Sequence, residues 1–123
     1  MAREEARICD TVRFFYDDPV ASLVINSLQG DPSLGTEEPD RARRVVRLGA
    51  INIAQAQRDG EIDPSLDPAL LVAMILSGVM GGISEALATS PRPALTKVQL
   101  QICTFVARAA GADYEPSPML ADA

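Results

Sequence analysis

Few side chains in this sequence of 123 residues could carry out acid–base, nucleophilic or metal chemistry. The sequence lacks histidine, the commonest general base and the commonest metal ligand in proteins. Its two cysteines, Cys9 and Cys103, are too far apart to indicate a metal motif, and we expect buried hydrophobic residues rather than a disulfide. The residue types therefore predict no catalytic site, no bound metal and no cofactor.

Glu85 is the best remaining candidate for enzyme chemistry, because it stands in an otherwise apolar stretch. A carboxyl group buried there could act as a general acid or base. Its position near the end of a predicted helix favours a different interpretation, in which Glu85 is solvated or hydrogen-bonded across an interface. We therefore expect a protein that is not an enzyme.

Charge also limits the possible partners. The net charge is −6, so the chain should repel the phosphates of nucleic acids. Four arginines crowd one section, at positions 41, 43, 44 and 47. Glu37, Glu38 and Asp40 precede them, which favours internal pairing on a solvated helix face over contact with an anion or an acidic partner. Residues 1–18 contain no secretory signal, and we expect a cytoplasmic protein.

The rest of the chain is organised around one stretch, residues 60–87, which must position any functional residues. Gly60 is suited to closing a preceding helix, and Asp67-Pro68 to capping and starting the next one. Within the predicted helix 69–88, the only polar side chains are Ser77, Ser84 and Glu85. A helix that is apolar nearly all round must be buried on several sides.

The rest of the chain is also predicted to be helical. Apolar residues at helical spacing predict helices over 2–16, over 37–59 with Thr36 as its cap, and over 94–110. Another helix should begin at Asp18-Pro19 and end near Gly30, followed by a loop over 30–38. Because no segment alternates with period 2, we expect an all-α bundle of about five helices in one domain, 1–111, with a flexible tail, 112–123.

Two helices carry more apolar surface than one chain of this length can cover. The final helix has a second apolar face, which adds to the surplus of the central helix; this face consists of Leu100, Cys103, Ala107 and Ala110. Gly78, Gly81 and Gly82 each cost about 1 kcal/mol in a helix, which suggests a close helix–helix approach. In a membrane, Gly78 and Gly82 would form a dimerisation motif, but the acidic residues before the helix argue against a membrane span. A homodimer therefore remains the favoured interpretation.

The pattern resembles the C-terminal domain of the tetracycline-repressor (TetR) family of transcription regulators. The residues that carry the resemblance are AQAQRDGEI at 54–62, the helix start DPALL at 67–71, the glycines of the following helix and a final helix after a proline-rich gap. It covers the chain from about residue 18 to residue 111.

The resemblance implies that the last two long helices pair with their copies as a four-helix bundle in a homodimer. The expected interface residues are Leu71, Met74, Gly78, Gly82, Glu85, Val98, Ile102 and Phe105. It also implies a pocket for a small apolar or amphipathic effector between the earlier helices and the central helix. The candidate pocket residues are Phe14, Phe15, Leu23, Ser27, Val46, Ile53, Ile75 and Val79. For each of these eight pocket residues, plain core packing is the favoured interpretation when the residue is taken alone.

Family members begin with a DNA-binding helix-turn-helix head, and this sequence contains no segment that matches one. The sequence is compatible with a head that was removed and with a naturally headless variant. In either case we expect that this chain does not itself bind DNA. An alternative function is a helical dimerisation module without a ligand, which pairs with itself or with full-length relatives.

Overall fold

The computed structural model describes residues 1–21 and 39–122, and every regular element in these ranges is a helix. The bounds are α1 Ala2–Asp17, α3 Pro39–Arg58, α4 Pro68–Ala88, α5 Leu95–Ala110 and the short α6 Pro118–Ala121. The described residues contain no strand, which confirms the all-α prediction. The predicted cap Thr36, the loop 30–38 and most of the helix expected after Pro19 lie outside the described residues.

Local signals start and end the helices as expected. The Asp67 carboxylate accepts a hydrogen bond of 2.8 Å from the backbone N–H of Leu70, and Pro68 occupies the first turn of α4. The Asp18 carboxylate likewise accepts from the N–H of Val20 at 2.9 Å, where residues 19–21 are helical. Gly60 and Gly111 adopt φ values of +78° and +67°, the left-handed conformation that glycine tolerates best.

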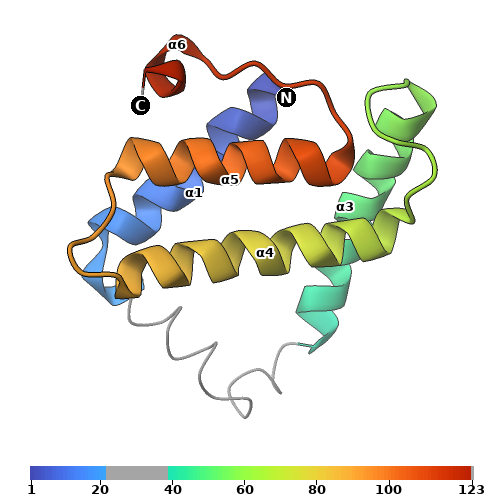
Figure 1. The fold of residues 1–123 in the computed structure, drawn as a ribbon. Helices are drawn as coiled ribbons and strands as arrows, with labels where there is room; N and C mark the ends of the chain where they lie inside the picture. The colour runs from blue at the N-terminus through green and yellow to red at the C-terminus, as the bar shows by residue number, and fades with distance from the viewer. Residues whose placement is uncertain (22–38, 123) are drawn as a thin grey trace.

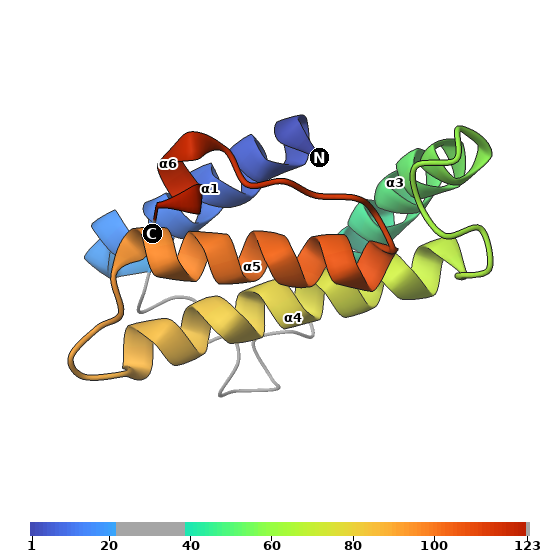
Figure 2. The same cartoon turned by 45° about the horizontal axis from the view of Figure 1, so that its top comes forward.

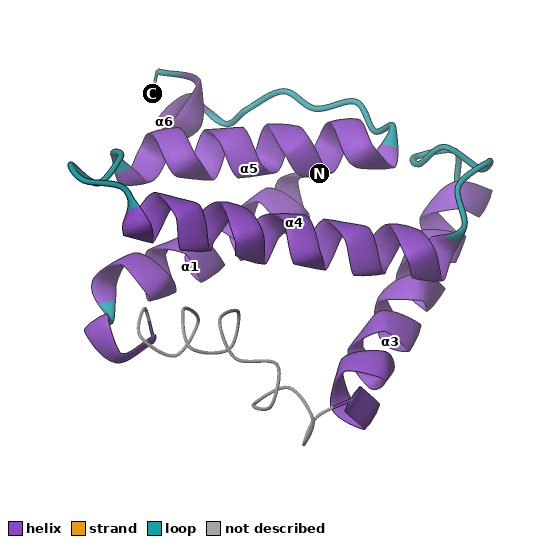
Figure 3. Cartoon of the chain, turned by 60° about the horizontal axis from the view of Figure 1, so that its bottom comes forward, coloured by secondary structure: helices purple, strands orange, loops and turns teal. Residues whose placement is uncertain are grey.

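The helices are arranged around the antiparallel pair α4 and α5 (Figure 1). α1 packs against both, and α3 crosses α4 near its N-terminal end, so that α1 and α3 lie at opposite ends of α4 (Figure 3). The α3 crossing depends on Gly49, because a Cβ atom there would lie 2.9 Å from the Cγ1 of Val72. A methyl group at this position would therefore push the two helices apart.

The main core joins α1, α4 and α5. Val12 and Ile83 are fully buried in it, and Ala86, Val98 and Ile102 are nearly so. Burying an aliphatic side chain of this size stabilises a fold by about 1.5–3 kcal/mol. The core thus fixes the positions of α4 and α5 from the side that faces α1.

The C-terminal segment differs from the flexible tail predicted for 112–123. After Gly111 it runs back along α5 towards α1, as Figure 2 shows. Leu120 is fully buried against Cys9 and Cys103. The Tyr114 hydroxyl donates to the Glu5 carboxylate at 2.5 Å, and the Ser117 backbone N–H donates to the same oxygen at 3.2 Å. One apolar side chain and one carboxylate anchor a segment whose composition indicates a loose end.

This segment also covers the second apolar face of α5, which the sequence leaves without a partner. Cys103, Ala107 and Ala110 are all buried, and Leu100 packs against the cluster under Leu120. That face is therefore covered within the chain, and the unpaired apolar surface belongs chiefly to α4.

The Glu5 anchor should make part of the stability dependent on pH. Hydrogen bonds from Ser117 and Tyr114 hold the pKa of Glu5 below its ordinary value of 4.5. A group with a lowered folded-state pKa stabilises the fold fully above its unfolded pKa, and this contribution disappears as the pH falls through the folded pKa. Glu5→Gln should therefore cost about 2 kcal/mol at neutral pH and less at about pH 3.

Urea unfolding at the two pH values measures this difference, and Glu4→Gln serves as the matched control. Glu4 is exposed and pairs only with Arg7 on the surface, at 3.3 Å, so its replacement should change stability by less than about 0.5 kcal/mol. Equal effects of the two substitutions at neutral pH would show that Glu5 does not anchor the segment.

Candidate functional site

The outer face of α4 exposes apolar side chains among the described helices. Leu70, Met74, Ser77 and Gly81 follow one another at helical spacing and are all exposed. The exposed fraction is 60% for both Leu70 and Met74, and 41% for the neighbouring Phe105 of α5. This outer face of α4 is apolar at one end and has small side chains in its middle.

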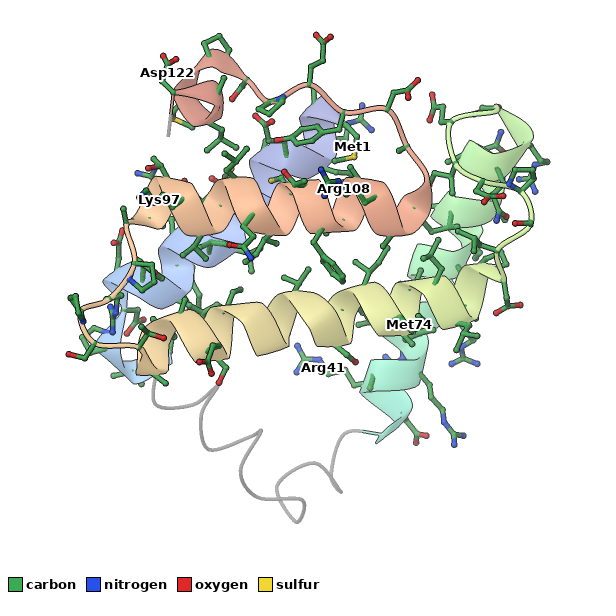
Figure 4. The ribbon with its side chains drawn as sticks, viewed as in Figure 1. Met1, Arg41, Met74, Lys97, Arg108 and Asp122 are labelled. Atoms are coloured by element: carbon green, nitrogen blue, oxygen red, sulfur yellow. The ribbon has the colours of Figure 1, made fainter. Side chains whose placement is uncertain are left out.

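Two grooves lie between α4 and α5, and the smaller one includes Leu70 and Met74 of this face. The larger, about 490 Å³, is lined by Gly78, Gly82, Glu85, Ala86, Thr89, Pro93, Lys97, Val98, Gln101, Ile102 and Phe105. The smaller, about 260 Å³, is lined by Leu66, Asp67, Leu70, Leu71, Met74, Ile75, Phe105 and Ala109. Phe105 contributes to both grooves. Figure 4 shows Lys97 and Arg108 along α5 and Met74 on α4.

The eight residues expected at a dimer interface all line these two grooves, but they differ in exposure. Leu71, Val98 and Ile102 are buried within the chain and form the floor. The exposed ones are Met74, Gly78, Gly82, Glu85 and Phe105. Because Glu85 is exposed, it also lacks the buried surroundings that a catalytic carboxyl group at this position would need.

The three glycines of α4 have different surroundings. A Cβ atom at Gly78 would lie 2.6 Å from the Cζ of Phe105, so this glycine already accommodates a ring of its own chain. At Gly82 the nearest atom would be the Cγ1 of Ile102, at an ordinary 3.8 Å. Among the described residues, no atom outside the backbone of its own helix lies within 4 Å of a Cβ at Gly81. The Phe105 ring of the same chain thus makes a close approach at Gly78, and the described residues leave Gly81 open.

Gly78→Ala should therefore destabilise the monomer, although alanine favours a helix by about 1 kcal/mol over glycine. The added methyl group would displace the Phe105 ring. In a Phe105→Ala background the same change should stabilise the chain by up to about 1 kcal/mol.

Urea unfolding is measured for the parent chain, Gly78→Ala, Phe105→Ala and the double variant, at a concentration low enough for monomers. The four free energies of unfolding give the interaction energy between positions 78 and 105. Gly81→Ala is the control, because it meets open space and should be stabilising in both backgrounds. A Gly78→Ala chain that is stabilised as much as Gly81→Ala would contradict the predicted contact.

The candidate pocket residues are not brought together by the described helices. Phe14 is 55% exposed on α1, whereas Phe15 and Val79 pack against the main core. Val46 lies in a hollow of about 310 Å³ on α3, with Ala42, Arg43 and Arg47. Ile75 lines the smaller α4–α5 groove, and Ile53 is partly buried on α3. Leu23 and Ser27 lie outside the described residues, so the pocket remains a prediction.

Sequence reasoning missed three contributors to these surfaces. Leu70 and Ser77 extend the exposed stripe of α4, and their spacing from Met74 is the signal that could have identified them. Tyr114 was assigned to a tail, and no local pattern connects it with Glu5, which lies 109 residues away. In the described part of the chain, no group of three or more Cys, Asp or Glu side chains is placed to hold a metal ion.

By length and composition, α4 is the one described helix that could cross a bilayer. The core helix of a water-soluble protein meets the same criteria, so this finding does not favour a membrane protein.

Comparison with protein-family models finds no match, and neither curated protein sequences nor solved structures show significant similarity to the chain.

Proposed function

We propose that this chain is the effector-binding and dimerisation domain of a TetR-like transcription regulator. One observation carries the proposal: the outer face of α4, with Phe105 of α5, is apolar, lined by small residues and uncovered. A protein that functions as a monomer rarely leaves a contiguous apolar patch of more than a few hundred Å² in water.

A second copy of the same surface would cover it best. Twofold pairing of α4 and α5 with their copies would produce a four-helix bundle, in which each contact occurs twice. The exposed Gly81 and Ser77 would allow the backbones of facing helices to approach closely. Glu85 and Lys97 line the same groove and would supply a charged rim, as is usual around an apolar interface.

The proposed effector is a small apolar or amphipathic molecule that binds on α3, because α1 and α3 lie at opposite ends of α4. Support for this part comes from the hollow on α3, where Val46 and Ala42 supply apolar contacts and Arg43 and Arg47 supply positive charge. An amphipathic molecule with an acidic group would match both features. DNA contact would be made by a separate helix-turn-helix head, consistent with the net charge of −6.

A thermal-shift screen tests the effector proposal. A molecule that binds only the folded state at about one hundred times its Kd stabilises it by about 2.7 kcal/mol, which raises the Tm by several degrees. Fatty acids, aromatic acids and uncharged hydrophobic metabolites are suitable probes. We expect an acidic amphipathic probe to raise the Tm and Arg43→Ala/Arg47→Ala to weaken that shift.

Val45→Ala is the control substitution, because Val45 lies on the same helix and does not line the hollow. If no probe raises the Tm while the chain remains a dimer, the alternative function gains support. That alternative is a dimerisation module without a ligand.

A further inference from the structure

The two cysteines, which are 94 positions apart in sequence, meet beneath the C-terminal segment. Cys9 on α1 and Cys103 on α5 belong to one buried cluster with Leu120, so the two side chains pack in the same part of the core. Both thiols are free. Their exposed fractions are 7% for Cys9 and 0% for Cys103. A dithiol is therefore enclosed where the first and last long helices pack.

Polar groups surround this dithiol, which is unusual for cysteines that serve only as small core residues. Tyr114 packs against the cluster and donates its hydroxyl to Glu5. The Gln99 side chain is fully buried and donates from Nε2 to the Cys9 carbonyl oxygen at 3.0 Å. Its Oε1 atom is buried without a hydrogen-bond partner. The Gln99 Oε1 atom is thus an unpartnered acceptor in the same buried region as Cys9. It is available to accept a hydrogen bond from the hydroxyl group of a sulfenic acid formed on Cys9.

We propose that Cys9 and Cys103 form an oxidative modification site, which a hydroperoxide converts into an intramolecular disulfide that ties α1 to α5. The site is separate from the α4–α5 grooves and does not depend on the proposed effector. Because the two side chains share one buried cluster, a disulfide of ordinary S–S length, about 2.0 Å, would join α1 and α5 where they already pack.

The reaction balances in two steps. The Cys9 thiolate attacks one peroxide oxygen, the O–O bond breaks, and Cys9 becomes a sulfenic acid while the hydroperoxide leaves as an alcohol. Cys103 then attacks the sulfenic sulfur, the S–O bond breaks, and the hydroxyl group leaves as water with the Cys103 proton. In total, two thiols are oxidised to one disulfide, and one hydroperoxide is reduced to one alcohol and one water.

The order of the two thiols follows from their surroundings. Burial raises the pKa of both, to about 12 for Cys103, so thiolate forms sparingly at either position. Cys9 is the more exposed of the two residues, so an oxidant reaches it first. Cys9 is thus the attacking thiol and Cys103 the resolving one, and Leu120 limits the access of the oxidant.

The test uses the whole reduced chain, treated with hydrogen peroxide or tert-butyl hydroperoxide and then alkylated. Mass spectrometry should show the loss of two hydrogen atoms and no alkylation, and peptide mapping should link the peptides of Cys9 and Cys103. Because the disulfide closes a loop of nearly one hundred residues, the Tm of the oxidised chain should rise by about 10 °C. Cys9→Ser and Cys103→Ser should show neither change.

Access is tested with Leu120→Ala, which should form the disulfide at least about tenfold faster than the parent chain, because it opens the cover over both thiols. Met119→Ala is the matched control, since Met119 is 58% exposed on the same short helix. Circular dichroism of the reduced Leu120→Ala variant shows whether it is folded. If it is not, the peptide mapping of the parent chain still tests the proposal. Three results would overturn the proposal. They are a disulfide that forms only after unfolding in urea, disulfides that are only intermolecular, and an oxidised chain that is less stable than the reduced chain.

Discussion

Gly81→Leu should convert a dimeric chain into a monomer without loosening its fold. Among the residues that the structure describes, nothing outside its own helix lies near a Cβ atom at this position, so the new side chain meets no neighbour on α5. In a twofold interface it would clash twice, at about 1–3 kcal/mol for each site. The dimer dissociation constant should therefore rise by roughly 30-fold to 25,000-fold.

Sedimentation equilibrium of the two chains over a range of concentrations measures this change. Ala69→Leu is the matched control, because Ala69 is also exposed on α4 but lies on a different face from the stripe of Leu70, Met74, Ser77 and Gly81. The control should dimerise like the parent chain. A parent chain that stays monomeric at micromolar concentration, or a Gly81→Leu chain that dimerises as tightly as the control, would refute the proposed interface.

Ending the chain at Gly111 should cost about 5 kcal/mol or more in stability. The deletion removes Leu120 from a fully buried position, which typically costs 2–5 kcal/mol. It also removes two hydrogen bonds to the Glu5 carboxylate, each contributing about 1.5–3 kcal/mol. Since whole domains are stable by about 5–15 kcal/mol, the shortened chain should be marginal or unfolded at room temperature.

A chain that ends at Ala121 is the control for this truncation. It keeps Leu120, Tyr114 and Ser117 and lacks only Asp122, which is exposed, and the last residue. Its urea unfolding curve should match that of the parent chain. If both truncations unfold at the same urea concentration as the parent chain, the C-terminal segment adds no stability and behaves as the flexible tail that its composition predicts.

Much of the fold follows from short-range signals. The carboxylates of Asp18 and Asp67 cap helices, and Gly60 and Gly111 end them, because each signal acts within one turn of the backbone. The surplus apolar surface of α4 is also predictable, since it depends only on which side chains share a face.

Contacts between distant segments were harder to predict. At Gly78 the sequence predicts a close approach by a second subunit. A sequence shows that a glycine permits close approach, but it does not show which group approaches. The group is Phe105 of the same chain. Leu120 is the only buried residue in its short helix, so no periodic pattern marks it. The candidate pocket residues share an apolar character with the core and cannot be separated from it by type.

The attachment of the C-terminal segment to α1 has a consequence for the order of folding during synthesis. Tyr114 leaves the ribosome 109 residues after Glu5, and the partners of α1 in the main core, on α4 and α5, are also made after it. A single helix of the length of α1 is marginal in water without partners. The described core contacts of α1 can therefore form only once α4 and α5 have emerged, so this core should form in one late cooperative step.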